Sequence, residues 1–180
     1  MPPIPRPVEV PVLTTERLVL RGHRIEDFAD SLALWSDADV TRYIGGKPLG
    51  AEDVWSRLMR HMGHWAMQGF GYWVIEEKDT GRVIGEAGFL NANRDMDPPF
   101  EGAPEIGWAL APAAHGKGLA TEAVKAIMAW GEETFGPVRT VCLISPENAP
   151  YFRVAEKARS REYARTTYKG APTVLLERPG

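Results

Sequence analysis

Apolar residues recur along the chain with two different periods. They lie three or four positions apart in residues 25–35, 51–67, 119–135 and 148–158, which predicts four helices. Elsewhere apolar and polar residues alternate, or apolar residues form short runs, and these patterns predict strands. The predicted strands are residues 17–23, 71–77, 81–91, 105–110, 139–144, 161–168 and 173–178.

The order of these elements predicts the fold class. A block of strands is followed by a strand–helix–strand unit and a closing pair of strands, which is typical of an α+β domain whose mixed sheet is covered by helices. A chain of 180 residues suits one such domain. We assign it residues 14–180, because the five prolines within residues 1–13 favour an extended N-terminal arm.

Charge and cysteine content narrow the classes of function. The net charge of −3 offers no basic field, so we expect no direct binding to nucleic acid or to an anionic membrane. The single cysteine, Cys142, lies in the apolar run RTVCLI, which favours an inert buried thiol without an intrachain disulfide. The sequence shows neither a membrane-spanning run nor the apolar core of a signal peptide, so we expect a cytoplasmic protein.

The stretch AHGKGLATEAV places two glycines immediately before the predicted helix 119–135. The first turn of a helix has unpaired N–H groups and a positive dipole end. Gly116 and Gly118 would let a large anion reach this backbone, while Lys117 and Thr121 could add a charge and a hydroxyl. The pattern therefore favours a phosphate or pyrophosphate ligand, although a plain turn has the same composition.

Two other phosphate-binding loops fit this stretch poorly. The P-loop spacing requires a glycine where the chain has Ala111. The dinucleotide fingerprint requires a third glycine where the chain has Thr121. The sequence thus disfavours a nucleotide triphosphatase and a dehydrogenase.

The segment PAAHGKGLATEAV resembles the acyl-CoA pyrophosphate loop of the GNAT acetyltransferase superfamily, whose motif is Gln/Arg-x-x-Gly-x-Gly/Ala. The segments TERLVLR, GEAGF, EIGWAL and NAPYFRVAEK are similar, in order and spacing, to the Rim-type branch of ribosomal-protein N-terminal acetyltransferases and their small-molecule relatives. The resemblance covers residues 14 to 178. It implies a mixed, mostly antiparallel central sheet of about six to seven strands flanked by about four helices.

The chain departs from the family pattern at several positions. Ala113 replaces the leading Gln/Arg of the loop motif, and Ala155 stands where many members have a general-acid tyrosine. Tyr151 stands where the Rim-type branch often has serine. Arg159 replaces the glycine that usually follows the last helix, and Ser160 replaces the apolar residue after it. The sequence therefore does not predict how this helix ends.

The resemblance implies an enzyme that moves an acetyl group from acetyl-CoA, its co-substrate, to a primary amine by direct attack. The amine would belong to a protein N-terminus or a small molecule, and no metal is implied. Backbone N–H groups of the strand EIGWAL would polarise the acetyl carbonyl. The implied cofactor-binding residues are Trp108, Ala109, Leu110, His115, Gly116, Lys117, Gly118, Leu119, Ala120, Thr121 and Asn148.

Two residues are the candidate catalytic groups. Glu105, at the start of EIGWAL, would accept the amine proton, with Glu86 of GEAGF as the reserve candidate. Tyr151 would protonate the leaving thiolate, because a phenol with a pKa of about 10 is protonated at neutral pH. The alternatives are solvated carboxylates and a tyrosine that only packs at the start of a helix.

Other interpretations stay open at this stage. A CoA-binding module without transfer activity is compatible with Ala113 and Ala155, and no residue sets the length of the acyl chain. The first two helices and the polar loop 91–102 are expected to build the acceptor cleft. His61 and His64 lie three residues apart on a predicted helix but without a metal-ligand pattern. A monomer and a homodimer are equally compatible with the sequence.

Overall fold

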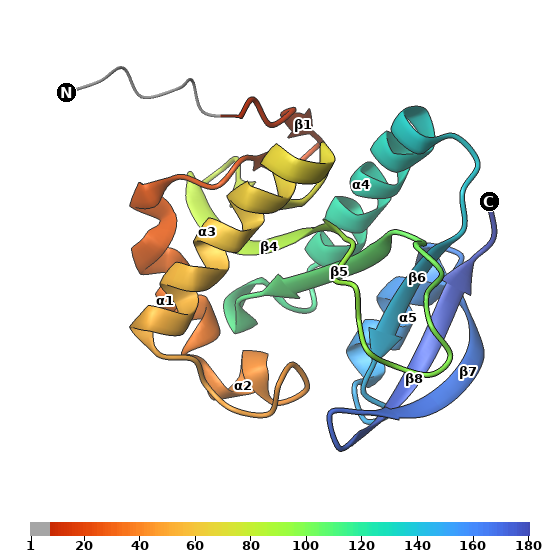
Figure 1. Cartoon of the computed structure of the whole chain (residues 1–180). Helices are drawn as coiled ribbons and strands as arrows, with labels where there is room; N and C mark the ends of the chain where they lie inside the picture. The colour runs from red at the N-terminus through yellow and green to blue at the C-terminus, as the bar shows by residue number, and fades with distance from the viewer. Residues whose placement is uncertain (1–7) are drawn as a thin grey trace.

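The computed structural model describes residues 8–180, which form one eight-stranded sheet with helices on both faces (Figure 1). The strand order is β1-β2-β3-β4-β5-β6-β8-β7, and every neighbouring pair is antiparallel except β5 and β6. The strands are β1 (Leu13–Thr14), β2 (Leu18–Arg21), β3 (Tyr72–Glu77), β4 (Arg82–Leu90), β5 (Glu105–Leu110), β6 (Thr140–Ile144), β7 (Arg161–Tyr168) and β8 (Ala171–Arg178). The predicted α+β class and mostly antiparallel sheet are confirmed.

Five α-helices accompany the sheet within residues 8–180. They are α1 (Phe28–Trp35), α2 (Ala38–Thr41), α3 (Ala51–Gln68), α4 (Leu119–Phe135) and α5 (Ala149–Lys157). The predicted counts of six to seven strands and four helices were too low. The two extra elements are β1, with two residues, and α2, with four, and neither is long enough to show a period in the sequence.

The predicted N-terminal arm lies partly outside the described residues, which begin at Val8. Residues 8–12 carry no helix or strand, and Leu13 already belongs to β1. The indole N–H of Trp73 donates to the carbonyl of Pro11 at 2.7 Å, so this part of the arm is tied to β3. Within residues 8–180, no helix has the length and apolar character needed to cross a membrane.

The two faces of the central strands differ in chemistry. On the face covered by α4, called here the α4 face, large side chains such as Trp73, Phe89 and Trp108 form the main apolar core. On the opposite face, called the α3 face, Ala109 packs in a smaller apolar cluster with α1 and α3. Figure 1 shows α1, α2 and α3 grouped on one side of the molecule and β6 to β8 on the other, with β5 between them.

The buried stripe of α3 contains one polar residue. Its buried side chains are Val54, Leu58 and Trp65, which are apolar, and His61, which lies beside the less buried Met62. The helix ends at Gly69, whose φ of +74° is the left-handed conformation of a helix C-terminus. A histidine on this stripe brings a polar ring against the sheet, where it stacks on Tyr72 of β3.

The end of α5 keeps the geometry that a glycine usually supplies. Arg159 takes a left-handed φ of +66°. The N–H of Ser160 donates to the carbonyl of Ala155 at 2.9 Å, and the N–H of Arg159 donates to that of Glu156 at 2.9 Å. These two bonds form the Schellman motif, so the departure from the family sequence leaves the helix end intact.

Candidate functional site

The glycine loop has the conformation that its sequence predicts. Gly116 and Gly118 have φ values of +74° and +77°, in the left-handed region that favours glycine. A Cβ atom placed on Gly116 would meet nothing within 4 Å, so the backbone there faces open space. Gly118 is the N-cap of α4, and no side chain among residues 8–180 caps this helix start.

The start of α4 offers unpaired donors to an external group. The first helical hydrogen bond runs from the N–H of Glu122 to the carbonyl of Gly118, at 3.1 Å. The N–H groups of the three preceding residues, Leu119, Ala120 and Thr121, therefore have no partner one turn earlier in the helix. The side chain of Leu119 is buried, whereas Lys117 is exposed beside the loop.

Arg17 is a loop contact that the sequence analysis missed. Its Nη1 donates to the carbonyl of Lys117 at 2.9 Å, and its Nε and Nη2 contact a carboxylate oxygen of Glu122 at 2.7 and 2.6 Å. In a trans peptide the C=O and the next N–H point in opposite directions. Arg17 therefore fixes the orientation of the Lys117–Gly118 peptide. The N–H of Gly118 points away from the Arg17 guanidinium. The only signal in the sequence was the arginine of TERLVLR, far from the loop.

The edge of β5 that faces β6 is largely free of strand partners. Within residues 8–180, β5 pairs with β6 in parallel at one position, where Glu105 faces Val141. The carbonyl of Trp108 instead accepts the hydroxyl of Tyr151, and that of Leu110 accepts Nε2 of His115 at 2.7 Å. Because the N–H and C=O of one strand residue point to the same side, the N–H groups of Trp108 and Leu110 also face this edge. The N–H of Ala109 faces β4 by the same argument.

Tyr151 and Asn148 come from the start of α5. The Tyr151 ring stacks on Trp108, with centroids 4.9 Å apart and an interplanar angle of 20°. Burial, with a smaller contribution from Tyr72, raises the pKa of Tyr151 above its ordinary value, so the phenol is protonated at neutral pH. Asn148 is the N-cap of α5, but its buried side chain makes no capping hydrogen bond.

Glu105 lies on the α3 face at the beginning of β5. Its two carboxylate oxygens accept from Nε and Nη2 of Arg94 at 2.6 and 2.7 Å. Arg94 also donates to the hydroxyl of Tyr168 at 3.1 Å. Glu105 is 5% exposed and lines a cavity of about 280 Å³. Most of the other lining residues belong to the predicted acceptor loop, and they include Asn91, Asn93, Arg94, Phe100 and Glu101.

Glu86 is enclosed in a buried polar cluster under α3. Its Oε1 accepts from Nε and Nη2 of Arg57 at 2.8 and 2.7 Å, and it lies 3.1 Å from Nε2 of His61. Nε2 of His23 lies 3.5 Å from the other oxygen. Burial by itself would raise the pKa of Glu86, but Arg57 and then His61 outweigh it and hold that pKa well below its ordinary value.

The histidines of the cluster differ from the pair considered in the sequence. His64 is engaged elsewhere, with Nδ1 2.7 Å from the carbonyl of Phe70 and Nε2 accepting the N–H of Asn91 at 3.0 Å. Donor atoms of His23, His61 and Glu86 lie within 4.8 Å of one another, a set that a metal ion can use. Arg57 already balances the carboxylate, so a divalent cation would bring uncompensated charge into a buried site. The donor set therefore fits a hydrogen-bonded cluster better than a metal centre.

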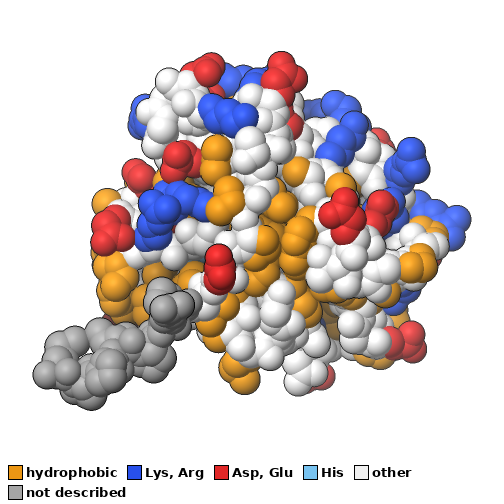
Figure 2. Space-filling model, turned by 90° about the horizontal axis from the view of Figure 1, so that it is seen from above, with side chains coloured by type: hydrophobic (Ala, Val, Ile, Leu, Met, Phe, Trp, Pro, Cys, Tyr) orange, Lys and Arg blue, Asp and Glu red, His pale blue; other side chains and the backbone are white. Residues whose placement is uncertain are grey.

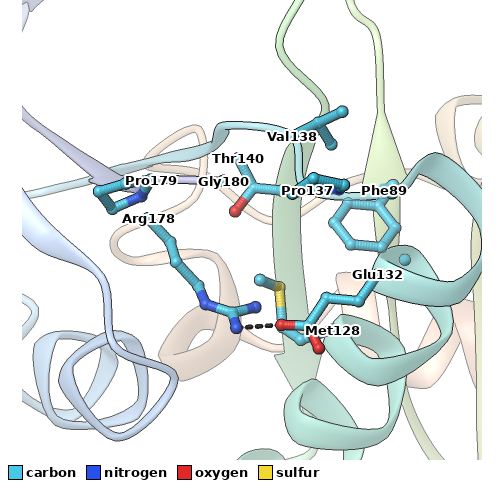
Figure 3. A pocket seen from close by; sticks show the side chains of 11 residues that line it. Phe89, Met128, Glu132, Pro137, Val138, Thr140, Arg178, Pro179 and Gly180 are labelled. Atoms are coloured by element: carbon cyan, nitrogen blue, oxygen red, sulfur yellow. Dashed lines mark hydrogen bonds and ion pairs between the residues drawn. The ribbon is translucent and has the colours of Figure 1, made fainter.

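A separate cavity of about 300 Å³ lies at the opposite end of α4 from the glycine loop (Figure 3). Its wall includes Phe89, Met128 and Thr140, and the ion pair of Arg178 with Glu132 spans it. None of the predicted site residues lines this cavity. The surface seen in Figure 2 carries acidic and basic side chains interspersed around apolar ones, in keeping with the small net charge.

Comparisons with known proteins agree with this geometry. The acetyltransferase (GNAT) domain family matches residues 17–161. The chain is 31% identical to the uncharacterised N-acetyltransferase p20 of Bacillus licheniformis over 143 residues, which are 79% of this chain and 78% of that protein. A GnaT-family acetyltransferase from Bordetella pertussis has 34% identity and a TM-score of 0.83, with 94% of this chain and 99% of that chain covered.

A more distant structure shares the fold alone. The aminoglycoside acetyltransferase AAC(6')-Ib, solved with coenzyme A, has 20% identity and a TM-score of 0.73 over 90% of this chain and 94% of its own. The family match spans most of the sheet, the glycine loop and α5. The chain therefore belongs to the GNAT acetyltransferase family.

Proposed function

We propose that this protein transfers an acetyl group from acetyl-CoA to a primary amine. The observation that carries the proposal is the uncapped start of α4, with its two left-handed glycines, beside the free edge of β5. The loop suits the pyrophosphate and the strand edge suits the acyl-pantetheine arm. The distant relative AAC(6')-Ib was solved with coenzyme A, which supports the same donor here.

The donor contacts follow from the positions of the predicted residues. Unpaired N–H groups from Gly118 to Thr121 would bind the pyrophosphate, and Lys117 would add a charge at the rim of the loop. His115 holds the end of β5 through Leu110 and so sets the distance between loop and strand. Asn148, whose side chain is not used as a cap, would contact the pantetheine arm.

The transfer forms a C–N bond and breaks a C–S bond at the edge of β5. The amine nitrogen forms a bond to the acetyl carbon, and the N–H of Trp108 stabilises the oxyanion. The N–H of Leu110 is about 7 Å further along the same edge, so it would bind the pantetheine arm instead. The intermediate collapses, the C–S bond breaks, and the thiolate takes the proton of the Tyr151 hydroxyl. Glu105 takes the proton that the amine loses, and solvent returns a proton from Glu105 to Tyr151.

Glu105 is a better candidate base than Glu86. Both carboxylates contact an arginine, but Glu105 lines a cavity, whereas Glu86 is enclosed by Arg57, His61 and His23. Each carboxylate oxygen has two lone pairs, and Arg94 uses one on each oxygen of Glu105. The remaining lone pairs can accept an amine proton directly or through water.

The similarity to other acetyltransferases supports an amine acceptor but leaves two kinds of amine. AAC(6')-Ib acts on aminoglycosides, and the Rim-type motifs of this chain favour a protein N-terminus. We propose an amine of low pKa in either setting, because an α-amino group with a pKa of about 7.7 to 8.0 is partly neutral at pH 7.5.

Isothermal titration with acetyl-CoA tests the proposal. Wild type should bind with micromolar affinity, and Gly116→Glu, which places a carboxylate at the pyrophosphate position, should weaken binding at least about tenfold. Gly170→Glu is the matched control, since Gly170 also has a positive φ, here +80°, and open space around it. Equal loss in both variants, or no binding by wild type, would contradict the proposal.

A second measurement separates transfer from binding. Acetyl-CoA turnover is followed with a panel of amines: an alkylamine, an amino sugar and a peptide with a free α-amino group. Acetylation of at least one of them is expected. Tight binding with no turnover on the whole panel, or with a longer acyl-CoA only, would replace the proposal with a CoA-binding module or with a different acyltransferase.

A further inference from the structure

We propose that Tyr72 is a further residue of the transfer site, and that its hydroxyl, together with Glu105, holds the incoming amine on the α3 face of β5. This inference rests on the proposed acetyl transfer and assigns its acceptor side. Tyr72 belongs to none of the motifs that carried the sequence analysis, and it stands two strands away from β5.

The sheet register carries the Tyr72 side chain to β5. Tyr72 of β3 is paired with Gly88 of β4, and Gly88 is paired with Gly107 of β5. Laterally paired residues present their side chains on the same face of a sheet, and glycines leave that face bare. A Cβ atom placed on Gly107 would lie 2.0 Å from the Tyr72 hydroxyl oxygen. The phenol therefore reaches across β4, and its hydroxyl lies directly over the backbone of β5.

The position over Gly107 is next to the proposed chemistry. Glu105 lies two residues earlier on the same strand, so its side chain leaves on the same face as the hydroxyl. Trp108, whose N–H would polarise the acetyl carbonyl, is the next residue. Between residues 8 and 180, Tyr72 takes part in one side-chain-mediated hydrogen bond, from Nε1 of Trp65 to its backbone carbonyl at 2.9 Å, which leaves the hydroxyl free.

The buried cluster under α3 holds the phenol in this place. The Tyr72 ring stacks on His61, with centroids 4.8 Å apart and an interplanar angle of 8°. His23 stacks on the other side of His61, also at 4.8 Å. Glu86 contacts His61 and is itself bound by Arg57. The cluster thus gains a role as the support of a site residue, and Glu86 acts through His61 instead of as a base.

The chemistry of the hydroxyl is that of a neutral phenol. Burial first, and then the charge of Glu105, raise the pKa of Tyr72 above its ordinary value. The hydroxyl cannot serve as a base, but its oxygen accepts hydrogen bonds. A primary amine can direct one N–H to Tyr72 and a second to Glu105 while its lone pair faces the acetyl carbon. A secondary amine loses one of these two bonds, so the arrangement selects primary amines.

The variant Tyr72→Phe removes the hydroxyl and keeps the stacked ring. The test uses the amine from the panel that wild type acetylates fastest, together with its N-methyl derivative. We expect KM for the primary amine to rise about tenfold, with the affinity for acetyl-CoA unchanged. Wild type should prefer the primary over the N-methyl amine about tenfold, and Tyr72→Phe should lose most of that preference. Tyr163→Phe is the control. Tyr163 belongs to β7 at the far edge of the sheet, and its buried hydroxyl has no hydrogen-bond partner among residues 8–180.

Different results would overturn the role of Tyr72 and the proposed acetyl transfer. An unchanged preference between the two amines in Tyr72→Phe overturns the inference, as does a parallel loss of acetyl-CoA binding, which would make Tyr72 a core residue only. Failure of wild type to bind acetyl-CoA or to acetylate any amine overturns the proposed function before a variant is compared.

A second variant tests the geometry without turnover. Gly107→Ala places a methyl group against the hydroxyl, so it should lower the melting temperature of wild type. It should lower that of Tyr72→Phe by less, because the nearest remaining ring carbon, Cζ, is 3.3 Å away. Equal losses in the two backgrounds would show that the hydroxyl does not lie over Gly107.

Discussion

The two sides of β5 are built on opposite principles. The donor side consists of the exposed loop 115–118 and the free edge of the strand, and its functional groups are backbone N–H groups within one short segment. The acceptor side consists of Tyr72, His61, Glu86 and Glu105 on the α3 face. These side chains are at most 5% exposed and come from four different elements. The donor side is an exposed segment of neighbouring residues, whereas the acceptor side is formed by residues that the fold brings together.

This difference separates binding from stability. Backbone donors in an exposed loop contribute little to folding, so changes there should affect donor affinity and leave the melting temperature almost unaltered. Buried charged and polar side chains are coupled to folding, because each one loses its partners when a neighbour is removed. Substitutions on the donor side should therefore change the affinity for acetyl-CoA, and substitutions on the acceptor side should change stability.

Loss of the Glu86 carboxylate should have the largest effect. Glu86→Gln leaves the Arg57 guanidinium without its buried counter-charge, which costs about 3–5 kcal/mol of unfolding free energy. Urea denaturation measures it. The control is Glu122→Gln on the donor side, where the partner Arg17 is 43% exposed and the loss should stay below about 1 kcal/mol. Equal losses would remove the distinction between the two sides.

Acid should weaken the acceptor side next. Burial first lowers the pKa of His61 from 6.5 to about 4, so the folded protein keeps it neutral while the unfolded chain takes up a proton. The unfolded state binds more protons between these two values, and stability therefore falls as the pH drops from 6.5 towards 4. The loss is at most about 3 kcal/mol.

Urea denaturation of wild type and His61→Gln across this pH range measures the effect. Glutamine can still bond to Glu86 but does not titrate, so the variant should lose less stability on acidification than wild type. A pH dependence identical in both proteins would show that His61 does not govern it.

The donor side and most of the fold were predictable from the sequence because their signals are local. A helix of 17 residues shows its period, and α4 begins and ends at the predicted residues. Gly116 and Gly118, which lie within three residues of each other, indicate both a positive φ and an exposed backbone. The elements that were missed, β1 and α2, are too short to show a period and depend on contacts with their neighbours.

The acceptor side could not be predicted in the same way. Tyr72 reaches β5 only because β3, β4 and β5 pair in one register and glycines occupy positions 88 and 107. His61 is buried and the adjacent apolar residue Met62 is not, although an apolar residue is the one expected on the buried face of a helix. Such placements depend on the relative positions of separate elements, and no spacing along the chain records them. The same limit explains why Arg17 was missed as a contact of the loop.

Arg17 should affect donor affinity more than stability. Arg17→Ala frees the Lys117 carbonyl, so the loop loses its fixed peptide. Glu122 keeps its hydrogen bonds from the Thr15 hydroxyl and the backbone N–H of residue 17, but it loses the guanidinium that balances its charge near the pyrophosphate. We expect acetyl-CoA to bind about tenfold more weakly, a change of about 1.4 kcal/mol. Titration with acetyl-CoA measures it.

Acetyl-pantetheine, which lacks the nucleotide and its pyrophosphate, provides the control for Arg17. Its KM should be the same for wild type and Arg17→Ala, because the contact at stake involves the phosphates. A rise in both constants would show that the variant disturbs the fold instead of the loop.

The smallest effect is expected at Lys117. Its side chain is exposed beside the loop, where solvent and salt screen its charge. Lys117→Ala should weaken acetyl-CoA binding about threefold at low salt, and the difference should shrink towards 0.5 M NaCl, where the Debye length falls to about 4 Å. The loss caused by Arg17→Ala should persist at that salt concentration, because it includes the position of a peptide as well as a charge. Titrations of both variants at two salt concentrations would thus divide the donor side itself into a screened electrostatic part and a backbone part. If the two variants lose affinity in parallel with salt, Arg17 acts through its charge alone.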